Sequence, residues 1–149
     1  SKAVKYLDTV LKTTKQIREY LNKKGYDKLV VDNVIEKLKE YKFLDDEAFA
    51  EAYVRTYQNK YGKSMLRNKL IEKGVSKIIV ENTLSDYECQ DEIIDKLLSK
   101  KIGTKELTPE LLAKCTRFLA SRGFSFDEIN SAIKRKKSHI GGENYESWN

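Results

Sequence analysis

Apolar side chains recur along the chain at the three- and four-residue spacing that predicts amphipathic helices. The first such helix covers residues 3–12. Thr13 and Thr14 then provide an N-terminal cap for a second helix, which ends at Lys24 and Gly25. A third helix can start after Asp27. The apolar positions of these helices are Val4, Leu7, Leu11, Ile17, Leu21, Val31, Val34, Ile35 and Leu38.

The pattern of the second and third helices returns twice, each time after 49 residues. The equivalent residues are Ile17, Leu66 and Cys115; Leu21, Leu70 and Leu119; Gly25, Gly74 and Gly123; Tyr26, Val75 and Phe124; Asp27, Ser76 and Ser125; Val31, Val80 and Ile129; and Ile35, Leu84 and Ile133. A fixed interval of this length is typical of repeat proteins.

The glycine of each repeat follows directly on a helix, which predicts a left-handed backbone at that position. We expect the next residue to fold an apolar side chain back onto the last helical turn. Asp27, Ser76 or Ser125 then caps the following helix, and Glu128 completes a capping box with Ser125. Each repeat therefore contains a tight corner that resembles a helix-turn-helix.

Another helix precedes the corner in the second and third repeats. It is marked by Phe49, Tyr53, Val54 and Tyr57, and by Ile93, Ile94, Leu97 and Leu98. Thr108 and Pro109 predict the start of a further helix. Residues 77–80 (KIIV) have β-propensity, but they lie between a cap and a helical stripe, so we interpret them as helix.

These elements predict an all-α fold of about nine helices in three tandem three-helix repeats. The repeats are 1–43, 44–87 and 88–137, and 138–149 has no periodicity, which predicts a flexible C-terminal tail. One repeat has too few apolar side chains to be stable alone. We therefore expect neighbouring repeats to stack into an elongated array that can curve.

The composition is that of a soluble, helix-rich protein, with 40% hydrophobic and 35% charged residues among 149. No apolar run approaches the roughly 20 residues that span a bilayer. Cys89 and Cys115 are too few for a disulfide framework. We therefore expect a reduced, cytoplasmic protein that does not enter a membrane.

The formal net charge is +6, and most of the basic excess lies in residues 1–43. This basic excess could serve to bind nucleic acid or an acidic protein surface, or it could contribute only to solubility.

Asp45, Asp46 and Glu47, with Glu51, could bind a divalent cation. A helix start explains them better, because carboxylates in a first turn complement the helix dipole and no matching cluster recurs in the other repeats. His139 is the single histidine and lies near no nucleophile in sequence, and no phosphate-binding glycine loop occurs. We predict no catalytic residue, no cofactor and no metal.

Basic side chains are the candidates for binding a partner. Lys60, Lys63 and Arg67 are spaced to follow one side of a helix, and Lys69 and Lys73 extend the positive segment. Lys12, Lys15 and Arg18 occupy comparable places in the first repeat. Such a stripe can bind phosphates or an acidic protein groove, or it can be a solvated helix face.

Two further groups leave alternatives open. Lys134, Arg135, Lys136 and Lys137 end the last predicted helix, where cations complement the dipole or contact a partner. Tyr53, Tyr57 and Tyr61 could stack on bases, but their four-residue spacing favours a helix face packed against the neighbouring repeat.

Residues 41–54 (YKFLDDEAFAEAYV), 62–70 (GKSMLRNKL) and 73–75 (KGV) closely resemble the central repeat of the RecX family, and the repeat pattern extends the resemblance over about residues 3–137. The resemblance implies tandem three-helix repeats and regulation of the recombinase RecA. Proteins of this family lodge in the groove of the RecA filament on single-stranded DNA. They hinder its growth and reduce strand exchange and ATP hydrolysis.

By this resemblance the expected partners are the RecA filament and the single-stranded DNA within it, with weak binding to free DNA. The chain is expected to act as a monomer. Two alternatives remain at this point: a helical-repeat protein that binds DNA directly through its corners, and a passive helical adaptor without a nucleic-acid role.

Overall fold

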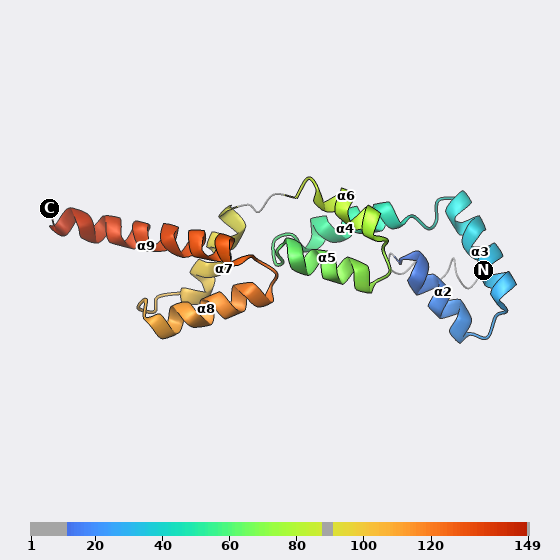
Figure 1. Cartoon of the computed structure of the whole chain (residues 1–149), viewed down its shortest axis with the longest axis horizontal. Coiled ribbons are helices and arrows are strands. Elements are labelled where there is room, and N and C mark those ends of the chain that lie inside the picture. Colours follow the sequence, from blue (N-terminus) through green and yellow to red (C-terminus); the bar gives the residue numbers. More distant parts are fainter. Residues whose placement is uncertain (1–11, 88–90, 149) are drawn as a thin grey trace. The chain divides into compact units, whose positions relative to one another are not determined.

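The structure, a computed structural model, describes residues 12–87 and 91–148, with 141–148 as backbone only, and every regular element in them is a helix. Eight helices and no strand occur in these ranges (Figure 1). They are α2 (Thr14–Lys23), α3 (Lys28–Glu40), α4 (Asp46–Tyr57), α5 (Lys63–Glu72), α6 (Lys77–Leu84), α7 (Asp91–Ile102), α8 (Pro109–Ser121) and α9 (Phe126–Trp148). The predicted all-α fold is confirmed. The helix expected over residues 3–12 lies almost wholly outside the described residues.

Two compact units divide the chain. One contains the residues up to Thr56 together with Arg67–Asp86, and the other contains Tyr57–Leu66 together with the chain from Tyr87 onward. The division falls within α5, after Leu66, so neither unit coincides with one sequence repeat. The repeat boundaries inferred from the sequence stay a prediction.

The corner predicted for each repeat is present three times. Gly25, Gly74 and Gly123 have φ values of +89°, +94° and +94°. The residue after each glycine donates its N–H to a carbonyl five residues earlier, from Tyr26 to Leu21, Val75 to Leu70 and Phe124 to Leu119, at 3.0–3.3 Å. These bonds satisfy carbonyls that a helix end leaves without a partner. The left-handed glycine and the residue after it, which we call the fold-back residue, therefore stabilise the corner together.

The predicted caps are mostly confirmed. Thr13 forms a capping box with Gln16, Thr108 accepts from the Leu111 N–H at 3.1 Å, and Ser125 forms a box with Glu128 (2.8 and 3.1 Å). Ser76 accepts from Ile79 at a longer 3.4 Å. The prediction is wrong for Asp27, which lies at the cap position of α3 but makes no side-chain cap bond.

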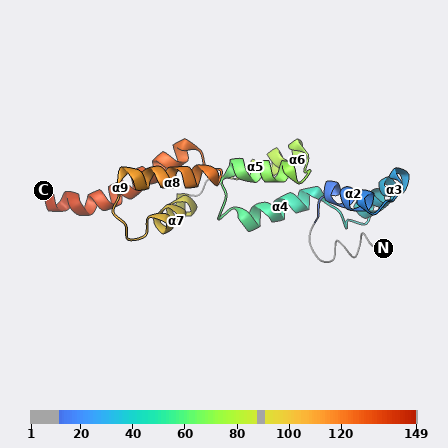
Figure 2. The same cartoon turned by 90° about the horizontal axis from the view of Figure 1, so that it is seen from below.

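Each unit has an apolar core built from the predicted stripes. In the first, Ile17, Leu21, Val31, Ile35, Leu38 and Leu44 form one buried cluster. In the second, α7, α8 and α9 contact one another (Figure 2) and bury Ile94, Leu98, Ile102, Cys115, Leu119, Phe124, Ile129 and Ala132.

The fold-back residue differs between repeats. Val75 and Phe124 are 3% and 4% exposed, as predicted, whereas Tyr26 is 41% exposed. Tyr26 keeps the backbone bond to Leu21, but its ring, which carries a polar hydroxyl, stays in contact with water. The corner therefore forms without burial of its apolar residue in the first repeat.

A hydrogen bond joins the start of one repeat's second helix to the corner of the following repeat. The Thr13 hydroxyl donates to the carbonyl of Lys73 at 2.6 Å, and 49 residues later the Gly62 N–H donates to the carbonyl of Arg122 at 2.7 Å. The first bond lies within one unit and the second within the other. We call these two contacts the repeat junctions.

Helix α9 continues beyond the end that the sequence pattern predicted. It runs to Trp148, through most of the segment expected to form a flexible tail. Residues 134–137 therefore lie within the helix, so the interpretation of this basic run as a helix terminus is wrong. The missing apolar periodicity after residue 137 does not prevent a helix, and Gly141 and Gly142 each cost it only about 1 kcal/mol.

Candidate interaction surface

The acidic group at the start of α4 serves the fold. Asp45 accepts the Ala48 N–H at 3.1 Å, which confirms its interpretation as part of a helix start. Asp46 accepts from the backbone N–H and the hydroxyl of Thr14, at 2.9 and 3.1 Å. Asp46 therefore ties α4 to α2, whereas Asp45 caps α4 itself.

Neither a metal-type cluster nor a helix suited to span a membrane occurs in the described part of the chain. Within residues 12–87 and 91–140, whose side chains the structure describes, there is no group of three or more His, Cys, Asp or Glu side chains placed to hold a metal ion. In the same ranges no helix combines the length and apolar character that crossing a bilayer requires. The candidates that the sequence predicted are the basic side chains.

Two predicted candidates from α2, Lys15 and Arg18, line a cavity of about 640 Å³ in the first unit. Lys39 and Lys42 add positive charge there, and Asp45, Asp46 and Glu47 add negative charge; the remaining lining residues are Thr14, Leu44, Gly74, Ser76 and Ile79. Arg18 forms an ion pair with Asp32, and Lys15 lies 3.9 Å from Glu19. The cations of this cavity thus already have acidic neighbours.

The candidates on and after α5 differ in their contacts. The Nε of Arg67 lies 2.7 Å from a carboxylate oxygen of Glu81, which joins α5 to α6. Lys73 lies just after the helix, with its Nζ 5.7 Å from the centre of the Tyr53 ring. Lys63 and Lys69 are half-buried on α5, and Lys12 is half-buried ahead of α2.

Lys60 belongs to a basic cavity in the second unit that sequence reasoning missed. Its volume is about 390 Å³, and its lining residues are Lys60, Leu97, Lys100, Lys101, Phe118 and Arg122. We call it the Arg122 cavity. It brings together four cations from the end of α7, the end of α8 and the loop before α5.

Two of these cations lie over aromatic rings. Lys101 Nζ is 4.7 Å from the centre of the Phe118 ring, and Arg122 Cζ is 5.1 Å from the same centre and 5.9 Å from that of Tyr61. Contacts of this kind orient the cations. Arg122 could have been found from the sequence, because it stands 49 residues after the candidate Lys73.

The positive charge near the Arg122 cavity also reaches a buried thiol. Burial raises the pKa of Cys115, while Lys101 and Lys105 act in the opposite direction by stabilising the thiolate. The net shift is upward, so burial outweighs the two lysines. Cys115 therefore behaves as the small apolar core residue that the sequence predicted.

The tyrosines contact one another and other aromatic residues, both nearby and farther along the chain. Tyr57 stacks on Tyr61 with ring centres 5.6 Å apart, and Phe49 stacks on Tyr53 at 6.2 Å. The Tyr87 hydroxyl donates to the carbonyl of Tyr61 at 3.2 Å. Their proposed packing against a neighbouring repeat and their proposed stacking on bases both stay predictions.

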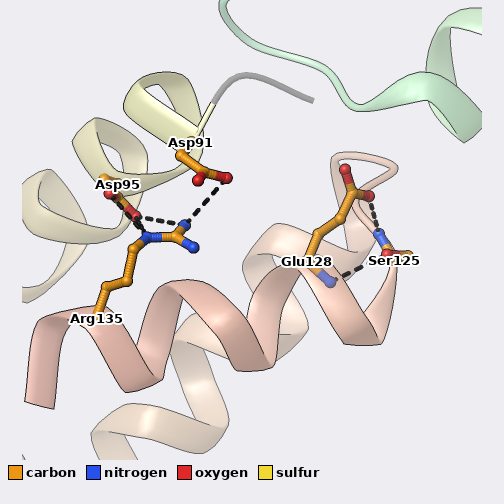
Figure 3. A network of polar contacts seen from close by, with 5 residues as sticks. All are labelled: Asp91, Asp95, Ser125, Glu128 and Arg135. Carbon is orange, nitrogen blue, oxygen red and sulfur yellow. Dashed lines mark hydrogen bonds and ion pairs between the residues drawn. The ribbon is translucent and has the colours of Figure 1, made fainter. Parts of the chain in front are cut away.

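A polar network joins α7 to α9 in the second unit. The Arg135 side chain extends from α9 to Asp95 and Asp91 of α7, at closest distances of 2.9 and 3.6 Å (Figure 3). Arg135 and Asp95 also line a cavity of about 360 Å³ with Leu98, Ser99, Ala132, Lys136 and His139. This arginine has acidic partners, whereas no acidic residue in the described part of the chain lines the Arg122 cavity.

Models of three protein domains match the chain in tandem. They describe the first, second and third three-helix domains of RecX, and they match residues 1–38, 45–84 and 88–133. Together the three matches cover most of the 149 residues.

Similar curated proteins carry the name regulatory protein RecX. One from Clostridium botulinum (strain Alaska E43) is 38% identical over 138 residues, which are 89% of this chain and 65% of the relative. One from Bacillus velezensis is 33% identical over 145 residues, 91% of this chain and 54% of the relative. The chain thus spans somewhat less than two thirds of the length of these relatives.

A solved structure has the same fold over most of this chain. The crystal structure of RecX from Lactobacillus salivarius matches with a TM-score of 0.80 at 27% identity, over 90% of this chain and 91% of the other. A second crystal structure, of a regulatory protein RecX, matches with a TM-score of 0.77 over 89% of this chain and 70% of the other, at 24% identity.

Proposed function

Because this chain belongs to the RecX family, we propose that it regulates a RecA filament on single-stranded DNA by binding to it. Binding modulates, and mainly inhibits, the recombinase and ATPase activities of the filament. The observation that carries the proposal is the tandem match of all three RecX domain models along one chain. The regulation works through contact and requires no reaction at this protein.

The basic residues support such a role, because a nucleoprotein filament presents phosphates and acidic side chains. We propose that contact involves the cations identified in the sequence, which are Lys12, Lys15, Arg18, Lys60, Lys63, Arg67, Lys69 and Lys73. Arg18 and Arg67 already form ion pairs with Asp32 and Glu81. We therefore expect each of them to contribute less to binding than a lysine without an acidic neighbour.

The test is a titration of this protein into RecA filaments on single-stranded DNA. We expect substoichiometric protein to lower ATP hydrolysis and strand exchange together, because a bound regulator hinders filament growth. A heat-denatured sample serves as the control. An unchanged ATPase rate across a broad titration would remove the proposal.

The alternative is direct action on nucleic acid, and the convergence of four cations in the Arg122 cavity is the observation that favours it. Binding to naked DNA would then weaken steeply with salt, with a slope of about one logarithmic unit per phosphate contact. Strong inhibition of the filament beside negligible binding to naked DNA would exclude this alternative.

A further inference from the structure

The Arg122 cavity has a charge imbalance that the two other described cavities lack. Lys60, Lys100, Lys101 and Arg122 line it, and among the residues that the structure describes no acidic side chain does. The cavity beside α2 contains three carboxylates, and the one beside Arg135 contains Asp95. Four neighbouring cations give this cavity a positive potential that attracts an anionic group.

Helix ends fix the backbone positions of three of these cations. Lys100 and Lys101 lie in the last turn of α7, and Arg122 follows directly on α8. The carbonyl of Arg122 accepts the Gly62 N–H at a repeat junction, which fixes the backbone beside the cavity. The helix ends therefore fix where these side chains leave the backbone, so no backbone needs to be ordered when a ligand binds.

The remaining lining side chains, Leu97 and Phe118, are apolar and half-buried. Lys101 and Arg122 already lie over the Phe118 ring, and Arg122 lies near Tyr61, so these rings are poorly placed to stack on bases. An apolar floor beneath cations fits an aliphatic side chain flanked by carboxylates. The volume of about 390 Å³ suits a few side chains.

We propose that the Arg122 cavity binds an acidic peptide segment in which carboxylates flank one aliphatic residue. The cations pair with the carboxylates, and Leu97 and Phe118 cover the aliphatic side chain. This inference deepens the proposed function and rests on it, because the segment would belong to the protein component of the regulated filament.

The experiment measures fluorescence anisotropy with a fluorescein-labelled peptide in which Asp and Glu flank a single Leu. Full-length chain is titrated as wild type, as Lys100→Glu/Lys101→Glu, and as the matched control Lys134→Glu/Lys137→Glu, whose lysines are also exposed but lie on α9. We expect the first pair to weaken binding at least about tenfold and the control less than about twofold. Replacing the peptide's Leu with Ser should also weaken binding.

Other outcomes contradict the proposal. Absence of peptide binding by the wild type overturns it, as does an equal loss in both lysine pairs, which would indicate general charge attraction. The same titration with labelled oligothymidylate detects a phosphate site: if the first pair weakens only the oligonucleotide, nucleic acid is the ligand and the proposal fails. Circular dichroism checks folding, and Lys60→Glu replaces the pair if folding is lost.

This binding assay contains no recombinase, so its result is separate from that of the filament titration. If the wild-type chain binds the peptide but does not inhibit the filament ATPase, the result counts against the proposed function alone. A negative peptide assay with intact inhibition would count against the cavity alone.

Discussion

Gly25, Gly74 and Gly123 occupy equivalent positions in sequence and have similar φ angles, but their surroundings differ. A Cβ atom at Gly25 would meet nothing within 4 Å. At Gly74 it would overlap the side chain of Lys15, and at Gly123 it would overlap the backbone of Met65. The left-handed conformation was predictable from sequence, whereas the space beside each glycine depends on the repeat junction.

We expect the three Gly→Ala variants to form a graded series in the free energy of unfolding. Gly25→Ala should cost about 1 kcal/mol, which is the strain of a left-handed alanine. Gly74→Ala should cost more, because Lys15 must move, and Gly123→Ala at least about twice as much as Gly25→Ala, because backbone must move. Urea denaturation measures the series. Equal losses at all three positions would show that the junctions are loose.

At the scale of helices, the sequence predicted most elements because each repeat carries its own start and stop signals. The 49-residue interval located the corners, the caps and the buried stripes together. The prediction failed where no such signal stands, at the end of α9 beyond residue 137. The link from α7 to α9 could not be predicted either, since Arg135 and Asp95 meet only when the helices pack.

We expect Arg135→Ala and Asp95→Asn to be coupled in a double-mutant cycle. The two-point contact between a guanidinium and a carboxylate should give a coupling energy of about 0.5–1 kcal/mol, because both side chains are partly exposed. The coupling should shrink in high salt. Lys134→Ala with Asp95→Asn is the control pair, and a cycle without coupling in low salt would refute the role of this contact.

At the scale of the whole chain, the candidate site was only partly predictable. Spacing along one helix grouped Lys63 with Arg67, but Arg67 pairs with Glu81, a contact between helices that the sequence does not show. The Arg122 cavity combines residues 60, 97–101 and 118–122, which are distant in sequence. Of its cations only Lys60 could be proposed from local spacing.

We expect Lys63→Glu to weaken inhibition of the filament several-fold, as the loss of one charge contact worth about 1 kcal/mol would. Lys77→Glu is the matched control, since Lys63 and Lys77 each begin a helix and a carboxylate there has the same effect on the helix dipole. ATPase titrations compare the two variants. Equal inhibition by both would show that Lys63 is not a contact.

The repeat junctions have a consequence for how such a chain can grow or be divided. The hydroxyl donor of Thr13 and its acceptor carbonyl at Lys73 belong to different predicted repeats, and so do Gly62 and Arg122. A gene segment that encodes one repeat therefore carries half of each bond to its neighbours. Duplication of a whole repeat supplies both halves at once, whereas a cut at a repeat boundary leaves a donor on one fragment and its acceptor on the other.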